Sequence, residues 1–190
     1  MSHPAPPISD PEDVVVLVDP DGTPRGVAPR ASVHTESTPL HRAFSCHVVR
    51  EDGRVLLTRR ALTKRTWPGV WTNSVCGHPR PGEDDLAAIS RRAQDELGLA
   101  VHDVQCVLPG YRYRAQDASG VVENEICPVY LARATAEPMP HPDEVMDLRW
   151  VDPAELTALV GAAPWIISPW AAEQLARLGP LLAAAPAVRG

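Results

Sequence analysis

One stretch of the sequence, residues 74–98, combines helix signals with chemically reactive side chains. Four apolar residues recur there at the spacing of one helical face: Leu86, Ile89, Ala93 and Leu97. This spacing predicts an amphipathic helix over residues 84–97 whose apolar stripe faces a core. Gly98 follows directly and favours the left-handed conformation that ends a helix. The charged residues of the stretch, Glu96 among them, fall off the stripe.

Cys76 and His78 flank Gly77 just before this predicted helix. A free cysteine is most often a small buried hydrophobe, so packing is the simplest role for Cys76. Its place beside a candidate metal ligand favours a chemical role instead, because a glycine in the same turn permits close approach of the backbone.

The rest of the chain mixes strand and helix signals without regular alternation. Strands are predicted at residues 14–18, 43–50, 54–59, 72–75, 104–107, 111–114, 121–133 and 147–151. Glu51-Asp52-Gly53 predicts a hairpin turn between the second and third of these strands. Cap-and-proline signals at Asp152-Pro153 and Ser168-Pro169 predict helices that run to about residues 160 and 178. This order indicates an α+β protein, an α/β/α sandwich with a mixed sheet.

Length and composition bound the domain organisation. The 190 residues predict one domain over residues 13–178, between a disordered N-terminal tail at 1–12 and a loose, alanine- and proline-rich tail at 179–190. The net charge of −6 argues against a nucleic-acid partner, and no apolar run is long enough to span a membrane. The four cysteines lack a pairing pattern, which indicates reduced thiols in the cytoplasm. The sequence leaves the oligomeric state open; we favour a monomer.

Two carboxylates and three histidines are candidates for a metal site. Glu123 and Glu125 alternate in a strand-like run and so point to the same side, although such a pair is more often a solvated strand face. His34 and His41, taken singly, are more often surface residues. Together with His78, however, these residues would form a five-ligand site for Zn²⁺, Mn²⁺ or Mg²⁺ with one position open.

The stretch from Gly77 to Leu99 resembles the Nudix box, in which a cluster of carboxylates holds the metal ions that cleave a diphosphate. The positions in register are Gly77, Glu83, Arg91, Glu96, Gly98 and Leu99. Arg92 and Asp95 depart from the box, since each stands where the box has a glutamate. A cation within the carboxylate cluster favours binding a diphosphate without cleaving it.

Segments beyond the box are similar to type I isopentenyl-diphosphate isomerases of the Nudix superfamily. They are residues 58–62, 67–79, 111–114, 122–129, 143–146 and 168–170, within a resemblance that spans about residues 12–175. The resemblance implies a Nudix-like fold. It also implies that isopentenyl diphosphate and dimethylallyl diphosphate are interconverted by proton addition and removal through a carbocation, in isoprenoid biosynthesis.

The same resemblance implies roles for individual residues. The catalytic residues it implies are Cys76 and Glu125 as acid and base, Tyr113 to orient the proton and Trp170 to face the cation. One divalent ion would be held by His34, His41, His78, Glu123 and Glu125, and a Mg²⁺ bound with the diphosphate by Glu96 and the carbonyl of Cys76. The diphosphate would be bound by Arg30, Arg60, Lys64 and Arg92. From residue type alone, the aromatic residues are as easily core and the basic ones a solvated face.

Two other functions stay open at this point. A Nudix diphosphate hydrolase would need the carboxylates that Arg92 and Asp95 partly remove, and it gives no role to Cys76. A non-catalytic diphosphate-binding module of the Nudix type would not require an acid and a base to converge.

Overall fold

The computed structural model describes residues 13–184. The strands in this range are β1 (Val14–Val18), β2 (Pro24–Pro29), β3 (His41–Arg42), β4 (Phe44–Arg50), β5 (Val55–Arg60), β6 (Trp71–Thr72), β7 (Val75–Gly77), β8 (His102–Leu108), β9 (Arg112–Gln116), β10 (Val122–Ile126), β11 (Val129–Ala134) and β12 (Val145–Val151). The helices are α1 (Arg30–Val33), α2 (Asp85–Leu97), α3 (Pro153–Ala162) and α4 (Pro169–Ala184), with a 3₁₀ turn, η1 (Pro164–Ile166). Of these, β2, β3, α1 and η1 were not predicted from the sequence. The single strand predicted at residues 72–75 is wrong, since β6 ends at Thr72 and β7 begins at Val75.

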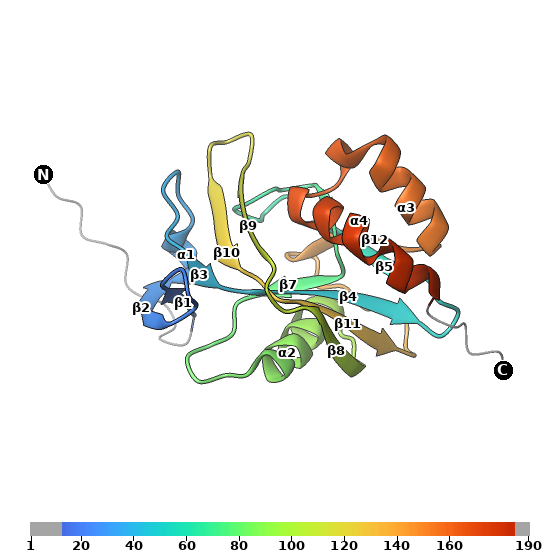
Figure 1. Cartoon of the computed structure of the whole chain (residues 1–190), viewed down its shortest axis with the longest axis horizontal. Coiled ribbons are helices and arrows are strands. Elements are labelled where there is room, and N and C mark those ends of the chain that lie inside the picture. The colour runs from blue at the N-terminus through green and yellow to red at the C-terminus, as the bar shows by residue number, and fades with distance from the viewer. Residues whose placement is uncertain (1–12, 185–190) are drawn as a thin grey trace, which may run out of the picture.

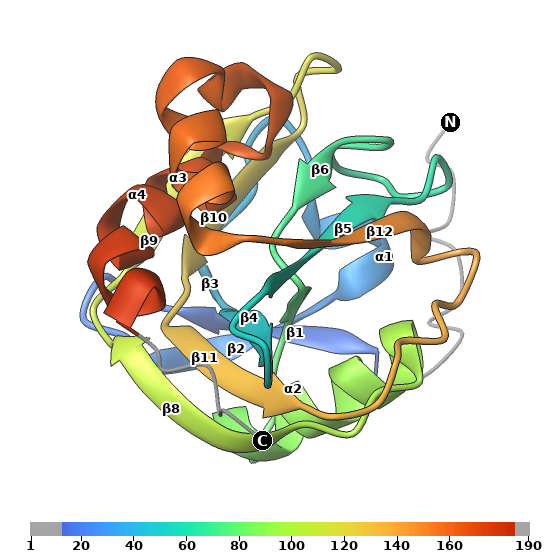
Figure 2. The same ribbon diagram turned by 90° about the vertical axis from the view of Figure 1, so that its right-hand side faces the viewer.

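The strands form two mixed sheets. The first has the order β2-β1-β3-β10-β9, and the second has the order β12-β5-β4-β11-β8, with β6 paired to β5 and β7 paired to β4. β3 pairs with β10 in parallel and β4 pairs with β11 in parallel, while the remaining pairs are antiparallel. Figure 2 shows β4, β11 and β8 side by side at one edge of the molecule.

Helices cover both faces of the second sheet, which gives the predicted α/β/α arrangement. Helix α2 lies on one side of β4 and β11, and α3 and α4 lie on the other (Figure 1). Ile89 and Leu97 of α2 are buried against Phe44 and Leu56 of the sheet. Leu175 of α4 belongs to a second buried cluster on the opposite face.

The local signals of α2 are confirmed except at its first turn. Asp84 caps the helix by accepting a hydrogen bond from the backbone N–H of Ala87 at 2.8 Å, and Gly98 ends it with φ at +57°. The predicted stripe is wrong at Leu86, which is 52% exposed. Leu86 lies in the first turn, and the buried face begins two residues later. Glu96 was expected off the stripe but is buried.

The prediction of one long strand over residues 121–133 is wrong. The segment forms two strands, β10 and β11, that belong to different sheets. The break falls at Cys127 and Pro128, and proline has no N–H with which to continue a ladder. The backbone N–H of Cys127 instead donates to the carbonyl of Tyr111 at 2.9 Å. The alternating pattern on either side gave no sign of this change of sheet.

Other boundaries follow their sequence signals. The hairpin between β4 and β5 is present, with Gly53 at φ +84°, and Asp152 caps α3 through the N–H of Ala154. The last helix is longer than predicted: residues 179–184, expected in a loose tail, continue α4. The expected N-terminal tail and residues 185–190 lie outside the described residues. None of the helices within residues 13–184 has both the length and the apolar character needed to cross a membrane.

Candidate active site

A cavity of about 740 Å³ is lined by residues of both sheets and of α1, α2 and α4. Eleven of the predicted site residues line it: Arg30, His34, Arg60, Lys64, Cys76, His78, Arg92, Tyr113, Glu123, Glu125 and Trp170. Two others do not. His41 is fully buried behind the wall, and Glu96 lines a small neighbouring pocket that also includes Cys76. The structure thus brings together residues that are far apart in the sequence.

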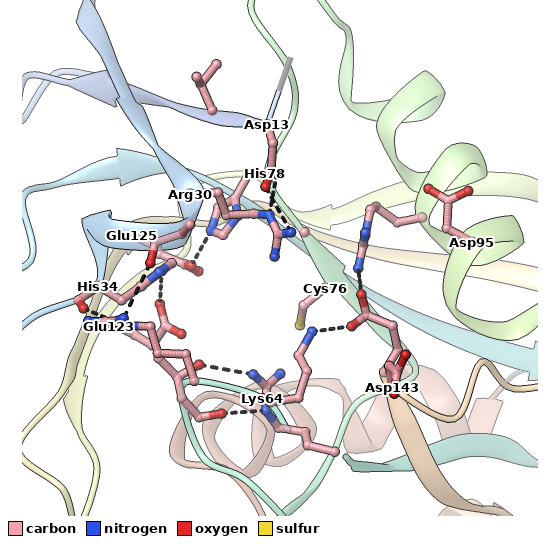
Figure 3. A pocket seen from close by; sticks show the side chains of 18 of the residues that line it. Asp13, Arg30, His34, Lys64, Cys76, His78, Asp95, Glu123, Glu125 and Asp143 are labelled. Atoms are coloured by element: carbon pink, nitrogen blue, oxygen red, sulfur yellow. Dashed lines mark hydrogen bonds and ion pairs between the residues drawn. The ribbon is translucent and has the colours of Figure 1, made fainter. Parts of the chain in front are cut away.

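Three histidines and a carboxylate converge at one side of this cavity. His41 Nε2 lies 3.2 Å from His78 Nε2. The carboxylate oxygen Oε1 of Glu125 lies 3.2 Å from His78 Nε2 and 3.5 Å from His41 Nε2. His34 joins this group, in which one ligand atom from each of the four residues lies within 4.8 Å of the others. Glu123 stands at its edge, with Oε2 3.0 Å from His34 Nε2. The five predicted ligands are therefore neighbours, and Figure 3 shows four of them: His34, His78, Glu123 and Glu125.

The spacing of these atoms fits a metal ion. Two adjacent ligands of an octahedral ion, each bonded at about 2.1 Å, lie roughly 3 Å apart. The neighbouring pairs in the cluster are 3.0 to 3.5 Å apart. His34 Nε2 and Glu123 Oε2 are buried without a hydrogen-bond partner among the described residues, although they face each other. Buried polar atoms without partners are rare, and a shared cation would satisfy both of them.

Local chain geometry explains this convergence. β3 and β10 pair in parallel with His41 opposite Glu125, so these two side chains lie side by side. Glu123 and Glu125 alternate along β10 and share a face, as expected from their spacing. Burial favours a neutral carboxyl, but the hydrogen bonds and charges of His41 and His78 outweigh it and hold the pKa of Glu125 well below its ordinary value. Glu125 therefore stays an ionised carboxylate, a group that binds divalent cations.

Cys76 lies on β7, on a different side of the cavity from Glu125 (Figure 3). Its sulfur lies 3.1 Å from Asn73 Oδ1 and 3.4 Å from Ser45 Oγ. Burial raises the pKa of the Cys76 thiol to about 11, against the smaller opposing effect of these hydrogen bonds. The group is thus a protonated thiol at neutral pH.

Aromatic rings form another part of the wall. Trp170 is held by a hydrogen bond from its indole Nε1 to Asn73 Oδ1 at 3.0 Å and by an edge-on contact with Trp67 at 5.1 Å. The Tyr113 ring lies 5.4 Å from the Trp170 ring, and β9 places Tyr113 opposite Glu125 in the ladder. Burial raises the pKa of Tyr113 well above its ordinary value, with the charge of Glu125 adding to the effect. Tyr113 therefore remains a hydroxyl donor beside the carboxylate.

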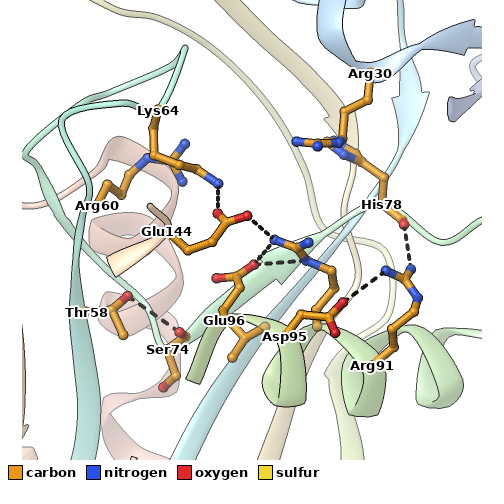
Figure 4. A network of polar contacts seen from close by, with 12 residues as sticks. Arg30, Thr58, Arg60, Lys64, Ser74, His78, Arg91, Asp95, Glu96 and Glu144 are labelled. Atoms are coloured by element: carbon orange, nitrogen blue, oxygen red, sulfur yellow. Dashed lines mark hydrogen bonds and ion pairs between the residues drawn. The ribbon is translucent and has the colours of Figure 1, made fainter. Parts of the chain in front are cut away.

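The basic residues line the cavity, but internal carboxylates partner several of them (Figure 4). Arg92 Nε donates to Glu96 Oε1 at 3.0 Å, and its Nη2 lies 3.3 Å from Glu144 Oε1. Lys64 pairs with the other oxygen of Glu144. Arg30 likewise pairs with Asp13, at 2.5 Å between Nε and Oδ1. These cations are held in place within the protein.

The box residues before the helix have a structural role. Arg91 donates to both carboxylate oxygens of Glu83 at 2.8 Å, which ties the loop before α2 to the helix. No larger residue fits at position 77 without movement of its neighbours, because a Cβ there would lie 2.8 Å from Arg92 Cγ and 3.2 Å from Phe44 Cε1. Gly77 therefore lets Arg92 cross directly over β7.

Three residues at the site were not predicted from the sequence. Glu144 was part of a segment similar to the isomerases, but its contacts with Lys64 and Arg92 join residues far apart in the chain. Asn73 likewise belongs to a segment similar to the isomerases, residues 67–79, but was not assigned a role, and Asp13 carries no motif. Contacts of this kind depend on the tertiary fold alone.

Most of the chain is similar to known proteins. The model of the NUDIX domain family matches residues 39–177. A protein of Agromyces mediolanus named isopentenyl-diphosphate Delta-isomerase is 60% identical over 170 residues, covering 90% of this chain and 82% of that protein. A protein of the same name from Brevibacterium linens is 56% identical over 171 residues, covering 90% and 94% of the two chains.

Solved structures agree at the level of the fold. A crystal structure of a protein from Deinococcus radiodurans aligns with a TM-score of 0.66 at 21% identity, covering 86% of this chain and 98% of that one. The MutT protein of Methanosarcina mazei Go1 aligns with a TM-score of 0.58 at 17% identity, covering 75% and 95%. At these identities the likeness concerns the fold and not the reaction.

Proposed function

The chain belongs to the Nudix family and, within it, to the isopentenyl-diphosphate Delta-isomerases, and on this premise we propose that it interconverts isopentenyl diphosphate and dimethylallyl diphosphate in isoprenoid biosynthesis. The observation that carries the proposal is the shared cavity of Cys76 and Glu125, which lie on different sides of it. An unactivated double bond moves by gaining a proton at one carbon and losing one at another, so an acid and a base must both reach the substrate.

The substrate gains one proton from one of these groups and loses one to the other, and exchange with solvent resets both groups between turnovers. A proton added to the terminal carbon of isopentenyl diphosphate gives a tertiary carbocation, and loss of a proton from C2 gives dimethylallyl diphosphate. One of the two groups must therefore be protonated while the other is not. The thiol of Cys76, whose pKa is raised to about 11 by burial, and the ionised Glu125 meet this requirement at neutral pH. Tyr113, beside Glu125, orients the proton there.

The carbocation needs a dry, electron-rich wall. Trp170 is 2% exposed, and its ring is fixed by Trp67, Tyr113 and the hydrogen bond to Asn73. The face of an indole stabilises a nearby cation by about 2 kcal/mol or more when water is absent. Trp170 thus stabilises the charge that forms between the two proton transfers.

Divalent cations fit two places in this scheme. We assign one ion, Mn²⁺, Zn²⁺ or Mg²⁺, to His34, His41, His78, Glu123 and Glu125, and a Mg²⁺ bound with the diphosphate to Glu96 and the carbonyl of Cys76. When bound, these ions supply positive charge that tunes the acidity of Glu125 and neutralises the diphosphate. Arg30, Arg60, Lys64 and Arg92 add charge-assisted hydrogen bonds to the phosphate oxygens.

Arg92 separates this proposal from a diphosphate hydrolase. Its guanidinium stands where the box of a hydrolase has another carboxylate, and it donates to one of the two oxygens of Glu96, Oε1. Incubation of the protein with labelled isopentenyl diphosphate and Mg²⁺ is the test. We expect an allylic diphosphate as the product. Released phosphate would identify a hydrolase, and an unchanged substrate would identify a binding module.

The state of the cysteines indicates the cellular compartment. Cys46, Cys76, Cys106 and Cys127 are all free, which suits the reducing cytoplasm. We propose a cytoplasmic monomer that acts on a small diphosphate, with neither nucleic acid nor membrane as a partner. Analytical ultracentrifugation of the purified protein tests the monomer.

A further inference from the structure

A buried polar chain runs behind Cys76 and ends on its sulfur. His47 Nε2 lies 3.0 Å from Gln174 Oε1, Gln174 Nε2 lies 3.0 Å from Ser45 Oγ, and Ser45 Oγ lies 3.4 Å from Cys76 Sγ. Ser45, His47 and Gln174 are each 0% exposed. None of the three lines the cavity, so none can touch the substrate.

The positions of β4, β7 and α4 bring the members of this hydrogen-bond chain together. Ser45 and His47 alternate on β4 and so point to the same side, where α4 presents Gln174. Ser45 is also the ladder partner of Cys76 across β4 and β7, which puts the hydroxyl beside the thiol. The chain therefore links α4, β4 and β7.

The direction of each hydrogen bond in this chain follows from the position of the proton on His47. An amide oxygen only accepts, so the proton of His47 must lie on Nε2, toward Gln174 Oε1. Nδ1 of His47 has no partner among the described residues, and an unpaired acceptor there is more easily tolerated than an unpaired N–H. Burial lowers the pKa of His47 to about 4, so the ring stays neutral. This orientation turns the amide nitrogen of Gln174 toward Ser45.

Counting the donors and acceptors of Ser45 completes the chain. Its oxygen accepts from Gln174 Nε2 at 3.0 Å and from Cys127 Sγ at 3.6 Å, which occupies both lone pairs. Its one proton is then left to donate to Cys76 Sγ. The other partner of that sulfur, Asn73 Oδ1, only accepts, and Asn73 is locked because its amide nitrogen donates to the carbonyls of Cys46 and Val75. Cys76 thus has one fixed donor and one fixed acceptor.

We propose that Ser45, Gln174 and His47 are positioning residues that hold a hydroxyl proton on the sulfur of Cys76, a role that rests on the proposed acid–base function of that thiol. The sulfur gains negative charge whenever its proton is on the substrate. A donor that is already oriented stabilises this charge without reorganisation, and the burial of Ser45 keeps bulk solvent away from the bond. The reaction runs in both directions, so the sulfur needs an acceptor for its proton and a donor for its charge.

Kinetics of three variants test the chain. We expect Ser45→Ala to lower kcat about 10- to 100-fold with little change in KM, because the lost bond matters only when charge forms. Gln174→Met keeps the shape but frees the Ser45 proton to turn away, so kcat falls less. The double variant should be no slower than Ser45→Ala alone, since both changes break the same chain.

Ser74→Ala is the matched control. Ser74 is as buried as Ser45, but its hydroxyl contacts only the backbone of Val48 and Leu56. Both alanine variants should lose stability, and only Ser45→Ala should lose kcat per folded molecule. The proposal would be wrong if Ser45→Ala kept its kcat. It would also be wrong if the decrease in kcat of the double variant equalled the product of the two single decreases.

A measurement without substrate separates this inference from the proposed function. The infrared S–H stretch of Cys76 is identified as the band that Cys76→Ala removes. We expect Ser45→Ala to shift that band and Ser74→Ala to leave it in place. A shift in a protein that does not isomerise the substrate would overturn the function and retain the chain. An unshifted band would overturn the chain whatever the activity.

Discussion

The two sides of the cavity carry opposite charges and differ in how those charges are partnered. On the histidine side, His34 Nε2 and Glu123 Oε2 are buried and face each other without a hydrogen bond. On the basic side, Arg92 and Lys64 share the carboxylate of Glu144. The first side is arranged for a cation that the protein does not supply. The second supplies its own counter-charge.

This difference has a consequence for binding. A metal ion held by His34 and Glu123 would satisfy two buried atoms that lie 3.0 Å apart and have no hydrogen-bond partner among the described residues. A diphosphate that reaches Arg92 must share it with Glu144 and Glu96, whose charges oppose an anion. Mg²⁺ bound with the diphosphate reduces this repulsion. We therefore expect changes on the histidine side to alter metal content, and changes on the basic side to alter KM.

Cys76 belongs to neither side, and removing it gives the largest expected effect. Cys76→Ala and Cys76→Ser should lower kcat about 1,000-fold or more, because a hydroxyl is far less acidic than a thiol and cannot replace it in proton transfer. Thermal unfolding and elemental analysis should show a folded protein with its metal unchanged. Substantial activity in Cys76→Ser with normal metal content would make Cys76 a packing residue.

The histidine side is broken by His41→Ala. This fully buried residue lies within 3.5 Å of both His78 and Glu125, so its loss opens the cluster. We expect metal affinity and activity to fall together by about 100-fold, since a change even outside the ligands costs 10- to 100-fold. Elemental analysis measures the metal, and His102→Ala, at an exposed histidine, is the control. Full metal occupancy in His41→Ala would remove it from the ligands.

The basic side is broken by Arg92→Glu. The variant loses a charge-assisted hydrogen bond, about 1.5–3 kcal/mol, which corresponds to a rise in KM of roughly 10- to 100-fold. The new carboxylate would also face Glu96 and Glu144. Because the charge of the diphosphate does not change during the reaction, kcat should change less. The rise in KM should shrink as Mg²⁺ increases.

The same Arg92→Glu sample tests the rival reaction. In a hydrolase the variant would complete the carboxylate set of the box, and phosphate release would begin or increase. We expect no phosphate release. An unchanged KM would mean that Arg92 does not contact the diphosphate.

The sequence predicted those parts of the fold that depend on near neighbours. The cap at Asp152, the stop at Gly98 and the turn at Gly53 each need only a few adjacent residues, and all are present. The division of residues 121–133 between two sheets was missed, because alternation reads the same on either side of Pro128. Helix α4 was cut short because glycine and proline at positions 179 and 180 suggested an end.

The site was predicted in a similarly uneven way. Most candidate residues came from the resemblance to the isomerases, since His34 and Glu123 carry no signal by themselves. The structure brings these candidates to one cavity. The carboxylate of Glu144 and the amide of Gln174 could not be assigned, because their partners lie 80 and 129 residues away. Pairings of this length are set by the packing of whole elements and not by any local pattern.

The smallest expected effect comes from Gly77→Ala, which tests whether the two sides can be disturbed separately. A Cβ would lie 2.8 Å from Arg92 Cγ and 3.2 Å from Phe44 Cε1, so the Arg92 stem must move. The aromatic ring belongs to the core and is harder to shift. Overpacking of this kind costs about 1–3 kcal/mol of stability, and the displaced guanidinium should raise KM about 3- to 10-fold.

The control for Gly77→Ala is Gly110→Ala, where an added Cβ meets nothing within 4 Å. We expect it to leave KM and the thermal midpoint unchanged. Metal content should stay normal in both variants, because His78 is fixed through its contacts with His41 and Glu125. A loss of metal in Gly77→Ala would show that the turn couples the two sides. An unchanged KM would show that Arg92 adapts, since its stem could move while its guanidinium stays with Glu96 and Glu144.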